Sequence, residues 1–243
     1  MIVTTRKHSY FINENNLATV ELGSTLFDPK AGKIYLMLEP GVLTEIGEID
    51  AATVSTLEEL TDAIAAGGKI NVTENIDAPT GFKVTTDTII TNEGVISISE
   101  DVEGNGVFMI TEGVLTLDGK GTINGLDKSG WSMAVWATDN GKVIIKDGYF
   151  TNVGAYSPED SEHYDLIYAS NNGQVEILGG EFKCETPKWT LNIKNASRET
   201  ASIVVKGGKF HGFNPTEAEE GNFVAPGYKV VEESEGVFVV IAE

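Results

Sequence analysis

The side chains that could perform acid–base or metal chemistry are few and scattered in this sequence. The three histidines, His8, His163 and His211, stand far apart, and they form neither a metalloprotease pair nor part of a Cys/His zinc spacing. The only arginines are Arg6 and Arg198. The residue types therefore predict no catalytic residue, no metal site and no cofactor.

The one cysteine and one glycine-rich motif favour the same conclusion. Cys184 has no second cysteine with which to form an intrachain disulfide, and we expect a buried, inert thiol rather than a nucleophile. Gly119–Gly125 has glycines that superficially suggest a nucleotide-binding loop, but no helical pattern follows it. A dinucleotide site is therefore not expected.

Binding residues are best sought in the longest insertion, Thr151–Asp165. It carries Tyr156, His163 and Tyr164 among acidic residues. Aromatic rings stack on sugar faces, so these three side chains could contact a glycan or a neighbouring chain. The alternative is an ordinary solvated corner insertion. Trp136 lies in an alternating strand pattern and is predicted to be a core residue rather than a ligand platform.

The element that must position these side chains is a repeated short strand. The stretch GKVIIKDGYF, Gly141–Phe150, returns as Gly173–Phe182 and Ala201–Phe210. Apolar residues alternate in each copy, as they do in a strand with one buried face. Two or three strands recurring every 20–30 residues or so indicate a solenoid of strands.

Two aliphatic columns are expected to form the solenoid core. The first column is Ile96, Leu115, Val143, Val175 and Ile203, and the second is Ile98, Leu117, Ile145, Ile177 and Val205. Phe150, Phe182 and Phe210 are expected to stack on one another in successive coils. Asn140-Gly141 and Asn172-Gly173 are predicted to supply left-handed backbone at one corner.

The chain ends differ from the repeat. Ser55–Glu58 is predicted to be a capping box that starts a short helix closing one end of the coil. Tyr228–Val240 is predicted to form a hairpin. The sequence thus divides into a β-rich N-terminal module of mixed strands (residues 1–50), a solenoid (residues 51–212), and a C-terminal loop and hairpin cap (residues 213–243).

Charge and hydropathy exclude two classes of partner. The formal net charge is −20, so bulk electrostatics disfavour nucleic acids and anionic membranes. The first residues lack the apolar run of a secretory signal, and no apolar run is long enough for a membrane span. The sequence therefore predicts neither export by a signal peptide nor a membrane anchor.

Two segments carry a resemblance to known families. The helix followed by KINV and the phrase GKGTING, Gly119–Gly125, resemble pectate-lyase-like right-handed parallel β-helices over about residues 55–212. This resemblance concerns the fold and not the activity. The C-terminal sequence from Gly207 onward is similar to the ends of β-helical proteins of tailed gut bacteriophages. Together with the N-terminal module, the chain resembles a phage head fibre or capsid decoration protein.

The resemblance implies an all-β fold, a right-handed parallel β-helix, in a structural virion protein on the outer capsid surface. Residues 1–50 would dock on the major capsid protein or another virion protein, and the coil would project outward, where it could contact host glycans. The expected docking residues are Arg6, Lys7, His8, Tyr10 and Phe11.

Catalysis is not expected within this fold. The pectin-hydrolase pattern needs clustered aspartates, Gly-His-Gly and Arg-x-Lys, whereas here His211-Gly212 follows Phe210 and no Arg-x-Lys is present. Two alternatives stay open: a tail spike or other polysaccharide-degrading enzyme, and a bacterial surface adhesin. Assays for reducing ends and unsaturated products would separate the enzyme from the structural protein.

A homo-oligomer is expected, a trimer before a dimer, because a projecting fibre gains rigidity and avidity from parallel chains. The C-terminal hairpin has more apolar surface than a lone hairpin hides, which places the predicted interface at Val237, Phe238 and Val239. The outward positions Ile144 and Val204 are apolar too. The alternative is that the loop after residue 212 covers these surfaces.

Overall fold

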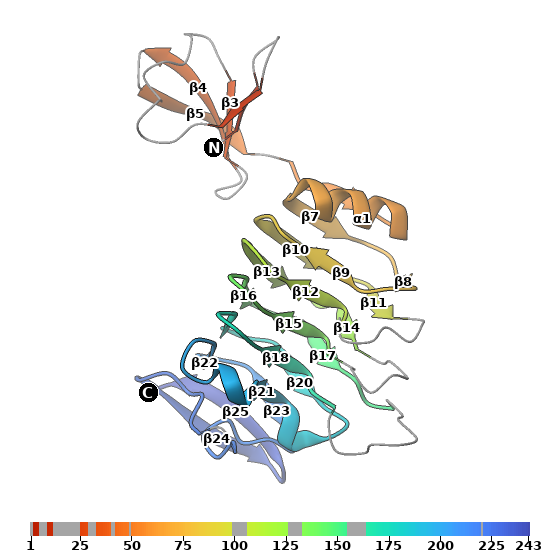
Figure 1. The fold of residues 1–243 in the computed structure, drawn as a ribbon, viewed down its shortest axis with the longest axis vertical. Helices are drawn as coiled ribbons and strands as arrows, with labels where there is room; N and C mark the ends of the chain where they lie inside the picture. The colour runs from red at the N-terminus through yellow and green to blue at the C-terminus, as the bar shows by residue number, and fades with distance from the viewer. Residues whose placement is uncertain are drawn as a thin grey trace.

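The structure, a computed structural model, describes residues 2–4, 9–11, 25–28, 33–39, 42–48, 50–98, 106–125, 133–154, 164–219 and 221–243. Strands make up most of these residues, and they are accompanied by a single α-helix and two short 3₁₀ helices. Figure 1 shows an N-terminal group of strands and a longer body in which strands lie above one another like rungs. The predicted all-β class is confirmed, with parallel sheets in the body.

The N-terminal strands form one five-stranded sheet. These strands are β1 (Ile2–Thr4), β2 (Ser9–Phe11), β3 (Thr25–Asp28), β4 (Lys33–Glu39) and β5 (Val42–Glu48). Their order is β2-β1-β3-β4-β5, and the described pairings are all antiparallel rather than mixed. The next strand, β6 (Ala52–Val54), pairs in parallel with β7 (Gly68–Val72) and so belongs to the body.

The body contains three sheets, which we call the first, second and third. The first sheet adds to β6 and β7 the strands β10 (Thr88–Asn92), β13 (Val114–Asp118), β16 (Lys142–Ile145), β19 (Gln174–Ile177) and β22 (Ser202–Val205). The second has β8 (Ile76–Ala78), β11 (Val95–Ile98), β14 (Thr122–Asn124), β17 (Tyr149–Thr151), β20 (Glu181–Lys183), β23 (Lys209–His211), β25 (Val237–Ala242) and β24 (Tyr228–Ser234). The third has β9 (Phe82–Val84), β12 (Phe108–Ile110), β15 (Val135–Ala137), β18 (Ile167–Ala169) and β21 (Leu191–Ile193). The two 3₁₀ helices are η2 (Pro187–Trp189) and η3 (Asn195–Ser197).

Consecutive strands visit the three sheets in turn. We call three consecutive strands, one from each sheet, a rung: β13, β14 and β15 form one rung, and β16, β17 and β18 form the next (Figure 1). Each strand pairs in parallel with the equivalent strand of the next rung. A side chain therefore lies directly above the one at the same position of the rung before it, at about 4.8 Å strand spacing.

The register corrects the first member of each predicted column. The inner aliphatic column of the first sheet is Ile70, Ile90, Leu117, Ile145, Ile177 and Val205. Ile96 and Ile98, predicted to belong to the first sheet, lie in the second, where Ile96 pairs with Ile123. The prediction was wrong because a glycine precedes strands in both sheets, Gly94 before β11 as Gly113 before β13.

The predicted phenylalanine stack is confirmed in the second sheet. The ring centroids of Phe150 and Phe182 are 5.1 Å apart, and those of Phe182 and Phe210 are 4.8 Å apart, with interplanar angles of 12° and 10°. All three side chains are 0% exposed. Parallel in-register pairing places identical residues above one another, so the stack follows directly from the repeat.

The glycines at the predicted left-handed corner have a different role. The residues with positive φ there are Asp139 (53°) and Asn171 (54°), one rung apart. Gly141 and Gly173 are needed for space, because a Cβ on either would lie 2.2 Å from a carbonyl oxygen of the neighbouring rung. Asn171 Nδ2 donates to Asp139 Oδ1 at 2.9 Å, which ties the two corners together.

Both ends of the body are covered. Helix α1 (Leu57–Ala66) closes one end and buries Leu60 and Ile64 as predicted, but its N-cap is Thr56 with Glu59, one residue later than expected. The Glu59 carboxylate also accepts from the N–H of Ser55 at 2.8 Å. The prediction was one residue early because Ser55–Glu58 and Thr56–Glu59 both match the capping-box pattern. At the other end, β25 pairs with β23, so the hairpin covers the last rung of the second sheet.

The loop after residue 212 covers the last strand of the first sheet. Val205 N–H donates to the Phe223 carbonyl and the Val205 carbonyl accepts from Ala225 N–H, both at 2.9 Å. Phe213 and Phe223 are buried against the same core. The loop thus satisfies strand-edge groups that would otherwise offer a template for pairing with another chain.

Candidate functional site

Two of the five predicted docking residues lie in the N-terminal sheet. Tyr10 and Phe11 belong to β2, whose backbone pairs with β1. Arg6, Lys7 and His8 lie outside the described residues. The structure therefore supplies the strand that would carry part of this site, and the site itself stays a prediction.

The predicted glycan-contact residues divide in the same way. Tyr156 and His163 lie outside the described residues. Tyr164 is described and is 5% exposed, so its side chain does not present a ring to a ligand, and this part of the prediction is wrong. The physical reason is position: Tyr164 leads directly into β18, where the chain has already returned to the core.

Cys184 is buried beside this segment, as predicted. Its thiol donates to the Tyr164 carbonyl oxygen with a distance of 2.8 Å between sulfur and oxygen. Burial raises the pKa of Cys184 to about 12, so almost no thiolate forms at neutral pH. The side chain therefore acts as a small packing group.

Charged side chains on the outer face of the first sheet form a ladder across rungs. Glu176 in β19 lies between Lys142, with 3.6 Å between Nζ and Oε2, and Lys206, with 2.6 Å between Nζ and Oε1. The hydrogen bond from Lys206 is the main cause that lowers the pKa of Glu176. These charges stabilise neighbouring rungs, each exposed pair by a few tenths of a kcal/mol to about 1 kcal/mol.

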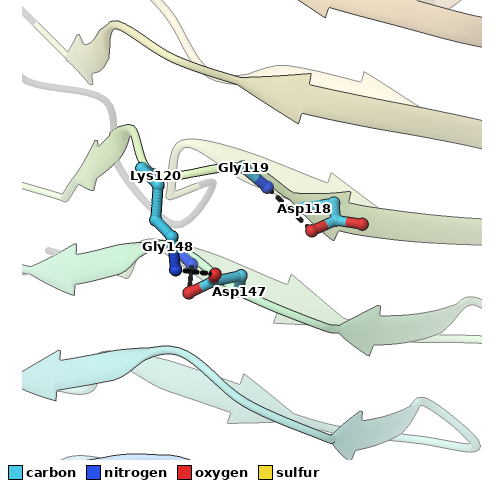
Figure 2. A network of polar contacts seen from close by, with 5 residues as sticks. All are labelled: Asp118, Gly119, Lys120, Asp147 and Gly148. Carbon is cyan, nitrogen blue, oxygen red and sulfur yellow. Dashed lines mark hydrogen bonds and ion pairs between the residues drawn. The ribbon is translucent and has the colours of Figure 1, made fainter.

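The glycine-rich phrase Gly119–Gly125 begins with a corner between the first and second sheets, at Gly119 and Lys120 (Figure 2), and continues as strand β14. Asp118 Oδ1 accepts from the N–H of Gly119, and Asp147 Oδ1 accepts from the N–H of Gly148 in the next rung, both at 2.9 Å. Lys120 reaches down to form an ion pair with Asp147. Burial alone would raise the pKa of Asp147, but the hydrogen bonds from Lys120 and Gly148 outweigh it, and the pKa is lowered. The phrase thus builds and links corners.

The predicted interface residues lie in β25, where they alternate between the inner and outer faces of the second sheet. Phe238 is opposite Phe210, and paired residues in antiparallel strands point to the same side, so Phe238 lies on the inner side. Val237 and Val239 alternate with it and lie on the outer side. Phe238 is half-buried and lines two hollows of about 430 and 280 Å³ at the end of the body.

Trp136 does not lie in the core, contrary to the prediction. Its neighbours Val135 and Ala137 are 0% exposed and face inward, so the indole stands on the outer face of the third sheet and is half-buried. In register with it on that face are Met109 before it and Tyr168 after it, followed by Asn192. We call these four side chains the aromatic face.

The aromatic face was missed although a signal for it exists. In Asp165–Ala169, as in Met133–Ala137, an aromatic residue occupies the middle of a three-residue strand between two aliphatic residues. Alternation places the middle residue on the face opposite its neighbours, and the neighbours are the smaller side chains. The sequence-based prediction recognised the alternating strand but placed Trp136 on its inner face, whereas the structure places Trp136 on the outer face.

The aromatic face is our candidate binding surface among the described residues, because two aromatic rings contact each other on the outside of the sheet. The ring centroids of Trp136 and Tyr168 are 6.2 Å apart with an interplanar angle of 50°. Within the described ranges, no group of three or more His, Cys, Asp or Glu side chains could hold a metal ion, and no helix is long and apolar enough to cross a membrane. The chemistry open to this surface is therefore binding, through packing of an apolar part of a ligand against the aromatic rings.

Comparisons with known proteins gave no match: no family model, no curated protein and no solved structure matches the chain.

Proposed function

We propose that the three sheets of the body form one right-handed parallel β-helix. Three observations support this reading: strands visit the sheets in a constant order, the rungs pair in parallel, and one buried cluster extends from Val54 to Val240. Crossovers between parallel strands of one sheet are almost always right-handed, which gives the hand.

We propose that the protein is a structural virion protein, a head fibre or capsid decoration protein on the outer capsid surface. The observation that carries this proposal is the division of the strands. In the described pairings, β1–β5 pair only with one another, whereas β6 opens the stacked body. A separate small sheet followed by a rigid stack suits a protein that attaches at one end and projects from a surface.

We propose a role in binding and not in catalysis, without a cofactor. Its support is that charged side chains on the outer faces pair with one another: Lys206 with Glu176 of the neighbouring rung, and Lys209 with Glu233 of the hairpin, each with 2.6 Å between Nζ and the carboxylate oxygen. A carboxylate held by lysines is a poor general acid at neutral pH. A polysaccharide-degrading tail spike and a bacterial adhesin are the alternatives.

Capsid attachment is tested by co-sedimentation with capsids assembled from the major capsid protein of the genome that encodes this chain. The full chain is expected to sediment with the capsids. A truncated chain of residues 51–243 is expected to keep its cooperative unfolding transition, because β6 and α1 close the body, and to stay in the supernatant. Residues 1–50 fused to a fluorescent protein are expected to restore sedimentation.

Two results would overturn capsid attachment through residues 1–50. One is sedimentation of the truncated chain at the level of the full chain. The other is a full chain that stays in the supernatant at every capsid concentration. Release of reducing ends or unsaturated products from polysaccharides would favour the tail-spike enzyme instead.

We propose a homotrimer, with a dimer as the alternative, and with the contact on the outer face of the hairpin. Val231 and Ile241 point outward with Val237 and Val239, and Val231 and Ile241 are each 42% exposed. This apolar strip replaces the predicted contact through Phe238, which faces inward. Exposed apolar side chains in a cluster mark interaction surfaces.

Light scattering at low and high salt tests the trimer. We expect the mass of three chains, with tighter association at high salt, because each chain carries a formal charge of −20 and screening weakens the repulsion. The double variant Val231→Glu, Ile241→Glu is expected to give monomers. Val153→Glu, at a side chain 42% exposed that follows β17, which two strands separate from the hairpin, is the control and should leave the mass unchanged. A monomer mass at both salts for the unaltered chain would refute self-association.

A further inference from the structure

The aromatic face lies in a column of outward side chains on the third sheet. Its column runs through Lys83, Met109, Trp136, Tyr168 and Asn192, one residue from each rung of the third sheet. All of these side chains alternate with residues that point into the core. The three middle rungs thus hold the large side chains of Met109, Trp136 and Tyr168, and the polar residues Lys83 and Asn192 stand at the two ends.

The indole of Trp136 is fixed by a buried hydrogen-bond network. Its Nε1–H donates to Ser170 Oγ at 2.9 Å, and Ser170 Oγ donates to Thr138 Oγ1 at 2.9 Å. Ser170 and Thr138 are 2% and 4% exposed. The ring is therefore held in one orientation, and the hydrogen-bonding need of its N–H is met within the protein. A side chain fixed before binding loses little conformational entropy when a ligand arrives.

Polar groups lie next to the second ring. Asn192 is in register with Tyr168, and its Nδ2 donates to Asp165 Oδ1 at 2.7 Å. Burial, with the nearby Asp165 carboxylate, raises the pKa of Tyr168 to about 12. The phenol therefore stays protonated at neutral pH and can donate a hydrogen bond. The two aromatic rings, together with the Asn192 amide, the Asp165 carboxylate and the Tyr168 hydroxyl beside them, make an amphipathic surface.

We propose that the aromatic face is a binding site for neutral glycans built of uncharged hexopyranose units. The C–H faces of such sugars are apolar and pack on aromatic rings, while their hydroxyls need donors and acceptors at the rim. Electrostatics favour neutral over anionic glycans, because the Asp165 carboxylate and the formal net charge of −20 repel anionic sugars. This inference deepens the proposed function by naming the ligand class of the projecting body.

The site also differs in place from the predicted glycan contact. The prediction used aromatic side chains of the insertion Thr151–Asp165, whereas the aromatic face lies on strands of the third sheet, and only the neighbouring Asp165 belongs to that insertion. Side chains on strands are held more firmly than those on loops, which favours recognition of a repeating, extended ligand. Rungs repeat at about 4.8 Å, close to the length of one sugar unit, so successive rungs can contact successive units.

Native affinity electrophoresis of the purified full chain tests the site. Gels contain one soluble polysaccharide each: hydroxyethyl cellulose, glucomannan, galactomannan, laminarin or dextran as neutral probes, and polygalacturonate as the anionic control. We expect at least one neutral polysaccharide to retard the protein and polygalacturonate not to do so. Titration calorimetry with the matching hexasaccharide then gives the affinity.

Variants locate the binding. Trp136→Ala and, separately, Tyr168→Ala are expected to weaken binding at least tenfold. Tyr149→Ala is the matched control, because Tyr149 is a half-buried, outward aromatic residue of the second sheet. It should bind as the unaltered chain does. Unfolding curves are recorded for each variant, and Tyr168→Ala leaves the Ser170 network intact, so one informative variant remains if Trp136→Ala unfolds.

The possible results separate this site from the capsid proposal. Failure of every neutral probe to retard the full chain, or equal retardation of Tyr168→Ala and the full chain, would overturn the glycan site. A change in oligomer mass in Tyr168→Ala, without any retardation by glycans, would assign the face to contact between chains instead and likewise overturn it. Capsid co-sedimentation uses residues 1–50 and is unaffected by either result.

Discussion

Replacing Phe182 with alanine is expected to lower the free energy of unfolding by about 3–5 kcal/mol. Phe182 is the middle ring of three, it is 0% exposed, and rings stack on it from both sides at 5.1 and 4.8 Å. Truncation removes its burial and leaves a cavity between two rungs that cannot approach each other, because their backbones are hydrogen-bonded at strand spacing. Urea unfolding followed by circular dichroism measures the loss.

Two neighbours control for this result. Phe182→Leu keeps most of the volume and is expected to cost clearly less than alanine. Lys183→Ala, on the next residue and exposed, is expected to change the free energy of unfolding by less than about 0.5 kcal/mol. Similar losses for Phe182→Ala and Lys183→Ala would mean that the stack does not hold the rungs together.

Ile145→Asn and Ile144→Asn are expected to have very different effects although the residues are adjacent and identical. Ile145 is 0% exposed and lies between Leu117 and Ile177, so its replacement removes apolar burial and places an amide among aliphatic side chains. We expect a loss of about 3–5 kcal/mol. Ile144 faces outward between Thr116 and Glu176, where an amide is solvated, and its replacement should cost less than about 1 kcal/mol.

The pair of variants is a direct test of strand phase. A slip of one residue would exchange the two faces and reverse the order of the two losses. Equal midpoints in urea would show that neither face of β16 is the core face. The same measurement reports on the whole column, since Ile145 is in register with its equivalents in the neighbouring rungs.

Local patterns in the sequence were enough to predict most strands and one end of the body. Apolar alternation located the strands of the first sheet from β13 onward, and the glycine pair Gly67-Gly68 marked the end of α1. The stack of Phe150, Phe182 and Phe210 was predictable because a repeated residue in a parallel, in-register stack must meet its own copy. These features depend on neighbours in the sequence or on simple repetition.

Which strand lies on which was decided only by the tertiary structure. Ile90, and not the predicted Ile98, pairs with Leu117. The sequence could not distinguish the two strands, because both alternate and both follow polar corners of variable length. The equivalent positions are between 20 residues (Ile70 to Ile90) and 32 residues (Ile145 to Ile177) apart, so no single period could be read from the sequence. Corner insertions cost little free energy and leave the stacking unchanged, which is why spacing carried little information.

The aromatic face also depended on the fold. Alternation in a strand of three residues shows that Trp136 points to the face opposite that of Val135 and Ala137, but it does not show which face is buried in the core. The side is settled by the rungs above and below: Val135 is in register with buried Phe108 and Ile167, so the space inside is filled and the indole must lie outside. Sequence alone determined that Trp136 and Tyr168 occupy equivalent positions of short strands, and only the stacking of rungs made them neighbours on one outer face.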